Sequence, residues 1–278
     1  MPEAKSWEVL ADAGPGGVIL GVDFPAAGRA EAGFADLLEK IGSHWSQYGF
    51  LQTVAPAGRL DRSALGPDYT ERWAGAIRAD GRQVAAVFGY CAGSVYAAAI
   101  AEEVRKWQQQ APMVILFDPH HVDAWAMTDE MYKMIGFFGG LLTADQVEDA
   151  KHRTVELARS ESGDIVDLAS ALIGLYQEIG SAAFDKVGLA EARRAEVINL
   201  FESYMAWLCA TAQIDPSDTW KRSPAILSAE YVAVTGQHPA VTSASKLLSR
   251  KIPVNVSHSD LLRSESTAQI VLDQMRNV

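Results

Sequence analysis

Three residues of this chain, Cys91, Asp118 and His258, could together carry out nucleophilic chemistry. A thiol becomes a strong nucleophile when an imidazole accepts its proton, and a carboxylate bound to that imidazole fixes its orientation. The chain presents them in the order nucleophile, acid, base, each where a strand is expected to end. Because the carboxyl ends of parallel strands gather at one edge of a sheet, residues this far apart in sequence can meet there. The pattern predicts a Cys-His-Asp triad.

The residues around Cys91 favour a sharp turn between a strand and a helix. Residues 84–88 form a continuous apolar run that suits a buried strand, and residues 91–104 have a composition that prefers a helix. Such a turn holds its central residue in a strained conformation, and Gly89 and Gly93 supply the space that it needs. The pattern matches the nucleophile elbow of α/β-hydrolases, with Cys in place of the usual Ser. A buried structural cysteine is the competing interpretation.

Two carboxylates compete for the role of the acid. Asp118 directly follows the apolar run 112–117, whereas Glu230 stands near the end of the next expected strand, 224–232. The α/β-hydrolase fold can place its acid after either strand, and we favour Asp118.

Four histidines are candidates for the general base. His258 follows the last expected strand, residues 252–257, and has a serine on each side. The other candidates are His120, His121 and His238. We favour His258 because only it follows the last strand, although any single histidine could be a hydrogen-bonded structural residue.

A tight loop of small residues is expected to help bind the substrate. Residues 18–24 read as a buried strand, and Pro25-Ala26-Ala27-Gly28 follows it at once. Backbone N–H groups at such a place commonly form half of an oxyanion hole. We expect Ala92 to contribute one N–H group and Ala26 or Ala27 the other; an ordinary strand-to-helix turn is the alternative.

The elements that position these residues alternate between strands and helices from residue 18 to residue 118, which is typical of a parallel sheet with crossover helices. The expected strands are residues 7–10, 18–24, 48–54, 84–88, 112–117, 224–232 and 252–257. The expected helices of this part are residues 29–41, 68–79, 91–104 and 264–275, with Asp68 and Ser264 as N-caps. The pattern predicts an α/β-hydrolase fold: a mostly parallel sheet with flanking helices and a large helical lid insertion.

The insertion is expected between residues 120 and 220, where helical spacing continues without a convincing strand. Its expected helices are residues 124–135, 143–159, 164–178 and 189–211, with Thr143 and Asp164 as N-caps. This divides the chain into a hydrolase core, residues 1–119 and 221–278, and a helical lid, residues 120–220. Such insertions commonly lie over an active site and exclude water.

Composition narrows the class of protein. The net charge of −11 and the pI near 5.0 argue against a partner such as nucleic acid or an anionic membrane. The N-terminus shows no signal peptide, and no apolar run is long enough to span a membrane. Cys91 and Cys209 are too few for a disulfide framework or a zinc cluster, so we expect free thiols in the cytoplasm and no metal or cofactor.

Several segments resemble the thioesterase family that serves nonribosomal peptide and polyketide assembly lines. The matching runs are FPAAG, YGFLQTVAPAG, FGYCAGS, MVILFDP and IPVNVSHSDLLRSES. The resemblance covers roughly residues 18–118 and 224–278. The spacing of 27 residues from Cys91 to Asp118 is similar to that of the family's integrated domains.

The chain departs from the family pattern at two positions. Ser94 stands where the family usually has a second Gly, a small change that fits, and Cys91 replaces the family's Ser. A Cys-based elbow also resembles that of dienelactone hydrolases. Those proteins lack a hundred-residue insertion and place the acid later, so we rank them second.

The resemblance implies a function in natural-product biosynthesis. A thiolate that attacks a thioester forms another thioester, so the acyl group stays activated for a further acceptor. We therefore expect an acyltransferase or thioesterase that takes its acyl group from the phosphopantetheine arm of an acyl or peptidyl carrier protein. The acyl group is expected to be held on Cys91 and then passed to an acceptor or cyclised. A hydrolase that releases free acid is the first alternative, and a non-catalytic binding protein on a hydrolase fold is the second. Basic residues at Arg193-Arg194 or between Lys246 and Lys251 could dock an acidic carrier.

Overall fold

The computed structural model describes residues 5–12, 14–26, 29–42, 46–54, 60, 66–160 and 164–276. These residues form two compact units. The α/β unit contains the described residues of Met1–Ala55, Gly66–His121 and Gln213–Val278. The helical unit contains those of Pro56–Leu65 and Val122–Ala212.

The α/β unit is built on one sheet, for which the described residues supply seven strands. They are β1 (Trp7–Ala11), β2 (Val18–Val22), β3 (Gly49–Thr53), β4 (Val84–Tyr90), β5 (Met113–Phe117), β6 (Pro224–Leu227) and β7 (Arg250–Pro253). The spatial order is β1-β3-β2-β4-β5-β6-β7. Strand β1 runs antiparallel to β3, and the other neighbours are parallel. The mostly parallel sheet predicted from the sequence is therefore confirmed.

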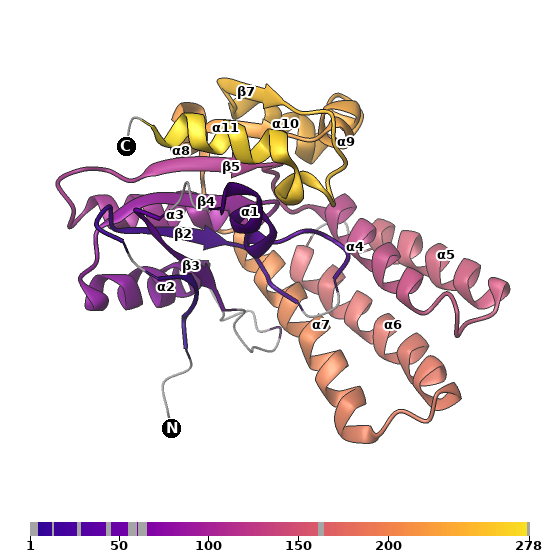
Figure 1. The fold of residues 1–278 in the computed structure, drawn as a ribbon. Coiled ribbons are helices and arrows are strands. Elements are labelled where there is room, and N and C mark those ends of the chain that lie inside the picture. The colour runs from indigo at the N-terminus through magenta and orange to yellow at the C-terminus, as the bar shows by residue number, and fades with distance from the viewer. Residues whose placement is uncertain are drawn as a thin grey trace. The chain divides into compact units, whose positions relative to one another are not determined.

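Helices cover both faces of the sheet. Those of the α/β unit are α1 (Phe34–Ile41), α2 (Gly66–Asp80), α3 (Gly93–Arg105), α8 (Ser217–Arg222), α9 (Ala229–Val234), α10 (Pro239–Leu247), α11 (Glu265–Met275) and the short 3₁₀ helix Leu261–Arg263. In Figure 1, α1 and α11 lie together on one face, and α2 and α3 lie together on the other. Each crossover helix thus returns the chain to the next parallel strand.

A cluster of phenylalanine side chains packs between α1 and the strands of the sheet. On the α1 face, the ring of Phe34 lies 5.5 Å from that of Phe50, 6.4 Å from Phe88 and 6.2 Å from Phe117, measured between centroids. All four side chains are fully buried. Burying a ring of this size stabilises the fold by roughly 1.5–3 kcal/mol. Because Phe88 and Phe117 lie in β4 and β5, this cluster fixes the two strands that carry Cys91 and Asp118 at their ends.

The last two predicted strands are shorter than expected. Strand β6 ends at Leu227 because Ser228 caps a helix, its Oγ accepting a hydrogen bond from Tyr231 N at 3.0 Å. Glu230 therefore lies in the first turn of α9 instead of at a strand end. Strand β7 stops at Pro253, so His258 follows a loop of four residues and not the strand itself.

One of the two predicted helix caps in this unit differs from the structure. Helix α2 begins at Gly66, which places Asp68 inside its first turn, so the N-cap prediction for Asp68 is wrong. Ser264 does occupy the N-cap of α11, but its Oγ contacts Ser266 Oγ at 2.7 Å instead of a backbone N–H.

The helical unit confirms the four helices predicted for the insertion. They are α4 (Ala124–Phe137), α5 (Ala144–Ser160), α6 (Ile165–Lys186) and α7 (Glu191–Thr211). Asp164 caps α6 as predicted, with its Oδ1 accepting from Val166 N at 2.8 Å. Thr143 and Gln146 exchange reciprocal bonds at the start of α5. Over the described residues, none of the helices combines the length and the apolar character needed to span a membrane.

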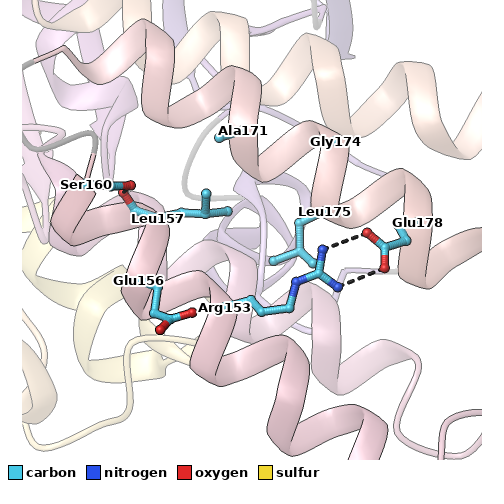
Figure 2. A pocket seen from close by; sticks show the side chains of 8 residues that line it. All are labelled: Arg153, Glu156, Leu157, Ser160, Ala171, Gly174, Leu175 and Glu178. Carbon is cyan, nitrogen blue, oxygen red and sulfur yellow. Dashed lines mark hydrogen bonds and ion pairs between the residues drawn. The ribbon is translucent and has the colours of Figure 1, made fainter.

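A groove of about 450 Å³ lies between α5 and α6 of the helical unit (Figure 2). Arg153 of α5 donates two hydrogen bonds to the carboxylate of Glu178 of α6, at 2.8 and 2.6 Å. Leu157 and Leu175 line the groove beside this pair. The pair is exposed, and neither a cysteine nor a histidine lines the groove, so we assign the Arg153–Glu178 pair the role of joining the two helices.

Candidate active site

Cys91 occupies the strained turn that the sequence predicted between β4 and α3. Its φ angle is 54°, in the left-handed region that residues other than glycine rarely adopt. A Cβ at Gly89 would lie 2.7 Å from the Cβ of Ala97, and a Cβ at Gly93 would collide with the carbonyl of Val22. Both glycines are therefore required by close packing. The turn directs the thiol away from the strand, and Cys91 is only partly buried.

Hydrogen bonds hold this turn in place. Cys91 N donates to Phe117 O at 2.9 Å, and Ser94 Oγ donates to Gly89 O at 2.8 Å. Ser94 is fully buried, and its carbonyl accepts from Trp220 Nε1 at 3.1 Å. The serine that replaces the family's second glycine thus fits, because its hydroxyl bonds the backbone of the elbow itself.

Asp118 and His258 lie together. His258 Nδ1 is 2.7 Å from Asp118 Oδ2, and Ser228 N donates to the other carboxylate oxygen, Oδ1, at 2.7 Å. The Asp118 side chain is buried, and its backbone has a φ of 46°. A backbone bond from Asp118 N to Ile226 O, at 3.1 Å, holds that conformation. Asp118 is therefore aimed at one nitrogen of His258, which leaves Nε2 for another partner.

Two further side chains hold His258. Glu230 Oε2 accepts from His258 N at 2.8 Å, so the rival carboxylate binds the backbone and not the imidazole. Tyr90 donates its hydroxyl to His258 O at 2.9 Å, and the two rings stack with centroids 4.9 Å apart at 13°. Burial raises the pKa of Tyr90, so its hydroxyl remains a donor. The histidine is thus fixed at both its ring and its backbone.

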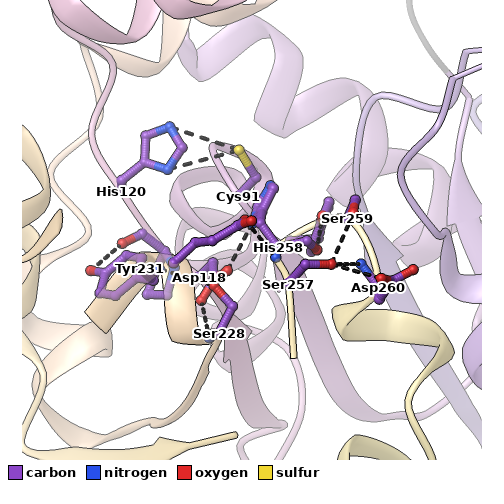
Figure 3. Close-up of polar contacts among 12 residues, drawn as sticks. Cys91, Asp118, His120, Ser228, Tyr231, Ser257, His258, Ser259 and Asp260 are labelled. Carbon is purple, nitrogen blue, oxygen red and sulfur yellow. Dashed lines mark hydrogen bonds and ion pairs between the residues drawn. The ribbon is translucent and has the colours of Figure 1, made fainter. Parts of the chain in front are cut away.

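A second histidine contacts the thiol. His120 Nδ1 and Nε2 lie 3.8 and 3.7 Å from Cys91 Sγ (Figure 3). Neither of the other two candidate histidines takes this position: His121 packs against Trp220 with ring centroids 4.9 Å apart, and His238 precedes α10. In the described part of the chain, no group of three or more His, Cys, Asp or Glu side chains is arranged to bind a metal ion.

The electrostatics of the site favour a thiolate. Burial alone raises the pKa of Cys91, but His120 and His258 outweigh this and lower the pKa to about 6. Burial alone lowers the pKa of His258, but its hydrogen bond with Asp118 and its interaction with Cys91 raise the pKa instead. Each group therefore stabilises the charged form of the other. The site can hold a thiolate beside an imidazolium at neutral pH.

The small-residue loop after β2 begins next to the elbow. Gly93 packs directly against the Val22 carbonyl, so the backbone after β2 starts beside the first turn of α3. Among the described residues, nothing accepts a hydrogen bond from the N–H of Ala92 or of Ala26. Ala27 lies outside the described residues. The structure thus brings the two backbone segments together.

An ion pair anchors that loop. Arg29 Nη2 lies 2.5 Å from Asp23 Oδ2, and Asp23 is buried. Arg29 Nη1 also donates to Phe24 O at 3.3 Å. Thr53 Oγ1 donates to Asp23 O at 2.6 Å, which joins the loop to β3. Charged groups therefore hold the described residues on either side of the loop, Asp23 and Phe24 before it and Arg29 after it.

Sequence reasoning missed several of these contacts. Asp23 was visible as a single carboxylate at the end of an apolar strand, and an arginine six residues later could have suggested the pair. Tyr90 occupies the variable position of the elbow pattern, which predicts no role for it. His120 was weighed as a base and set aside, and its place two residues after Asp118 was the available signal of proximity.

Comparison with known proteins gives the class of fold. No model of a known family and no curated protein matches the chain. Among solved structures, a four-domain nonribosomal peptide synthetase, AB3403 bound to AMP and glycine, is 14% identical over 100% of this chain, with a TM-score of 0.59. This chain spans only 21% of the length of that synthetase.

Two separate thioesterase domains match over almost their full length. The NocB thioesterase domain, in covalent complex with a fluorophosphonate nocardicin G analogue, is 16% identical, with 98% of this chain and 99% of that chain covered and a TM-score of 0.50. The Vlm2 thioesterase domain bound with a dodecadepsipeptide is 12% identical, with 96% of each chain covered and a TM-score of 0.51.

These likenesses show the fold. The chain has the α/β-hydrolase fold, with a mostly parallel sheet, flanking helices and the helical insertion α4–α7. It resembles the NocB and Vlm2 thioesterase domains at low sequence identity.

Proposed function

We propose that this protein is a thioesterase-type acyltransferase that carries its acyl group on Cys91. The observation that carries the proposal is a thiol at a strained elbow whose pKa is lowered by the charge of two imidazoles, one of which, His258, binds Asp118 through Nδ1 at 2.7 Å. Nucleophile, base and orienting carboxylate in this geometry are what covalent acyl transfer needs.

The reaction has two steps. The Cys91 thiolate attacks the carbonyl carbon of a thioester and forms a new carbon–sulfur bond, while backbone N–H groups of Ala92 and of Ala26 or Ala27 bind the oxyanion. The old carbon–sulfur bond then breaks, and the departing thiol takes its proton from His258. An acceptor next gives a proton to His258 and attacks the acyl group, and Cys91 leaves as a thiolate.

The sulfur favours transfer over hydrolysis. An acyl-Cys91 thioester is close in energy to a carrier thioester, so the acyl group remains activated for an amine, hydroxyl or thiol acceptor. A serine would form the less activated ester. Water can serve as acceptor in the same geometry, so hydrolysis to free acid is the competing function.

We also propose that the acyl group arrives on the phosphopantetheine arm of a carrier protein. The likeness of the fold to thioesterase domains of peptide synthesis supports this. Of the two basic clusters, Arg193 and Arg194 each bind an acidic neighbour, Glu196 and Asp185. Residues 246–251 instead present three exposed basic side chains on the α/β unit: Lys246, Arg250 and Lys251.

Intact-mass measurement tests the proposed function. The protein is mixed with an acyl-pantetheine or an acyl-carrier thioester and weighed, with Cys91→Ala as the matched variant and Cys209 left in place. An adduct that requires Cys91 and passes to an added acceptor supports transfer. Rapid appearance of free acid supports hydrolysis instead. Absence of any adduct and of turnover would leave only a binding role.

The carrier proposal has a separate test. Reversing Lys246, Arg250 and Lys251 to Glu should raise KM for the carrier-bound substrate about tenfold, because opposite charges steer and hold the two proteins. Reaction with the small acyl-pantetheine, which does not dock there, should stay within about twofold. Equal effects on both substrates would show that this cluster does not bind a carrier.

A further inference from the structure

His120 is a group in contact with Cys91 that the triad does not use. Its two ring nitrogens lie 3.8 and 3.7 Å from Sγ, so neither nitrogen is placed much closer to the sulfur than the other. Figure 3 shows His120 and His258 on different sides of Cys91. The nearly equal distances favour an interaction between the sulfur and the ring as a whole over one directed N–H bond.

The backbone holds His120 in this place. The chain leaves β5 through Asp118, with its positive φ, and then through Pro119, whose fixed φ limits the backbone. Tyr231 Oη donates to Pro119 O at 2.8 Å in a buried contact. His121 faces elsewhere and packs on Trp220. The segment thus presents one of its two adjacent histidines to the nucleophile.

Few charged groups of the α/β unit face the sulfur. Within the described residues of this unit, the titratable groups at the ends of the surrounding strands are Tyr90 in the last position of β4, Asp118 and His120 after β5, Glu230 and Tyr231 after β6, His258 after β7, and the mutually paired Asp23 and Arg29 after β2. Tyr90 is committed to the His258 carbonyl and Asp118 to the His258 ring. Among these described groups, only the two imidazoles bring positive charge against Cys91, because the Arg29 guanidinium is paired with Asp23.

The two imidazoles differ in how strongly they lower the pKa of Cys91. Burial raises the pKa of Cys91, and the charge of His120 is the largest influence in the opposite direction, ahead of His258. His258 also has to exchange protons with the substrate, which removes its charge for part of the cycle. A second cation beside the sulfur does not have this duty.

We propose that His120 is a second catalytic histidine that stabilises the Cys91 thiolate, both as attacking nucleophile and as leaving group, while His258 moves the protons. This rests on the proposed acyl transfer for its role in turnover. In the second step the bond between the acyl carbon and Sγ breaks, and the electron pair stays on the sulfur beside His120. The acceptor's proton goes to His258, so Cys91 needs none to leave.

The test measures thiolate formation directly and does not depend on acyl transfer. In a Cys209→Ala background, the rate of Cys91 alkylation by iodoacetamide is followed against pH for the starting protein, His120→Gln and His120→Phe. We expect the midpoint to rise by about one pH unit or more in both variants, since a nearby charge shifts a pKa by about 1–3 units. His121→Gln, the same change one residue along, should leave the midpoint in place.

The His258→Gln variant tests the proposal without altering His120. If His120 stabilises the thiolate on its own, the midpoint of His258→Gln should remain below the ordinary cysteine value of about 8.5. A midpoint that stays unchanged in the folded His120 variants, or that returns to the ordinary value in His258→Gln, overturns the proposal. A shifted midpoint in a protein that never forms an acyl adduct would instead contradict only the proposed function.

Discussion

The two cysteines of this chain lie in regions that shift the pKa of a thiol in opposite directions. Cys91 sits partly exposed at the turn between β4 and α3, against His120 and His258. Cys209 lies in α7 of the helical unit with only 4% of its surface exposed, and its Sγ donates to Ile165 O at 3.5 Å. The same side chain thus lies beside imidazoles at one position and in an apolar core at the other.

The pKa values express this difference. Burial and the nearby carboxylate of Asp164 raise the pKa of Cys209 to about 12, whereas the two histidines lower that of Cys91 to about 6 despite burial. Neither value follows from residue type or from burial alone. What distinguishes the sites is whether positive or negative charge faces the sulfur, and each variant below changes one part of that contrast.

Removal of the sulfur atoms should have the largest effect. We expect Cys91→Ala to lower acyl transfer by on the order of 10⁶-fold, since loss of a nucleophile leaves only binding and oxyanion stabilisation. Cys209→Ala should keep the activity and lower the free energy of unfolding by about 1 kcal/mol, through a small cavity. Steady-state kinetics and denaturant unfolding measure the two effects. Full activity in Cys91→Ala would refute the nucleophile assignment.

Removal of the carboxylate behind His258 should have the next largest effect. Asp118→Asn keeps the volume but loses the charge that orients the ring, and we expect kcat to fall by about 100-fold. A serine triad loses about 10⁴-fold, but here the thiol is already ionised, so less depends on the base. Glu230→Gln, which can still accept from His258 N, should lower kcat by less than tenfold. The reverse ranking would make Glu230 the acid.

Lowering the pH should reduce the reactivity of Cys91 and leave Cys209 unreactive. A pKa lowered to about 6 means that the thiolate dominates above pH 6 and is lost below it. Alkylation of Cys91 should therefore slow by about tenfold between pH 7 and pH 5 and change little between pH 7 and pH 8. Mass spectrometry of the two cysteine peptides gives both rates together. A midpoint near 8.5 would mean that the histidines do not act on the sulfur.

The sequence predicted the elements of the fold well where the signal is local. The strands that carry Cys91 and Asp118 are short apolar runs bounded by turn residues, and both were placed to within two residues. The strand predicted for residues 224–232 is too long because Ser228 ends it and caps α9. The sequence did not show this, because a helix that begins inside an apolar run does not change the hydrophobic spacing. Helix α10, with its mixed small and polar residues, was missed for a similar reason.

The sequence could predict only which residues of the site follow the ends of strands. The rule that strand ends converge predicts Cys91, Asp118 and His258, and in the structure Asp118 contacts His258 at 2.7 Å while the charge of His258 helps to lower the pKa of Cys91. That rule does not predict orientation. Both His120 and His121 follow β5, and only the backbone geometry at Asp118 and Pro119 decides which of them faces the thiol. The contact of Glu230 with His258 N likewise depends on the early end of β6.

Removal of the Tyr90 hydroxyl should have the smallest effect on kcat. It tests whether a contact that only positions His258 contributes to the difference in pKa between Cys91 and Cys209. Tyr90→Phe keeps the ring that stacks on His258 and loses only the bond to its carbonyl, made at 2.9 Å. A single hydrogen bond of this kind contributes about 1 kcal/mol, so kcat should fall by about two- to fivefold through looser placement of the imidazole. Tyr90→Leu also loses the stacking and should cost more.

The alkylation midpoint of Cys91 provides the control for this variant. If the two histidines set the charge on the sulfur and Tyr90 only positions His258, the midpoint in Tyr90→Phe should stay within about 0.3 units of the starting protein, since no charge has been removed. Loss of kcat with an unchanged midpoint separates positioning from activation. A midpoint that rises as far as in His120→Gln would show instead that thiolate stability depends on how tightly His258 is held, and that the difference between Cys91 and Cys209 lies in packing as much as in charge.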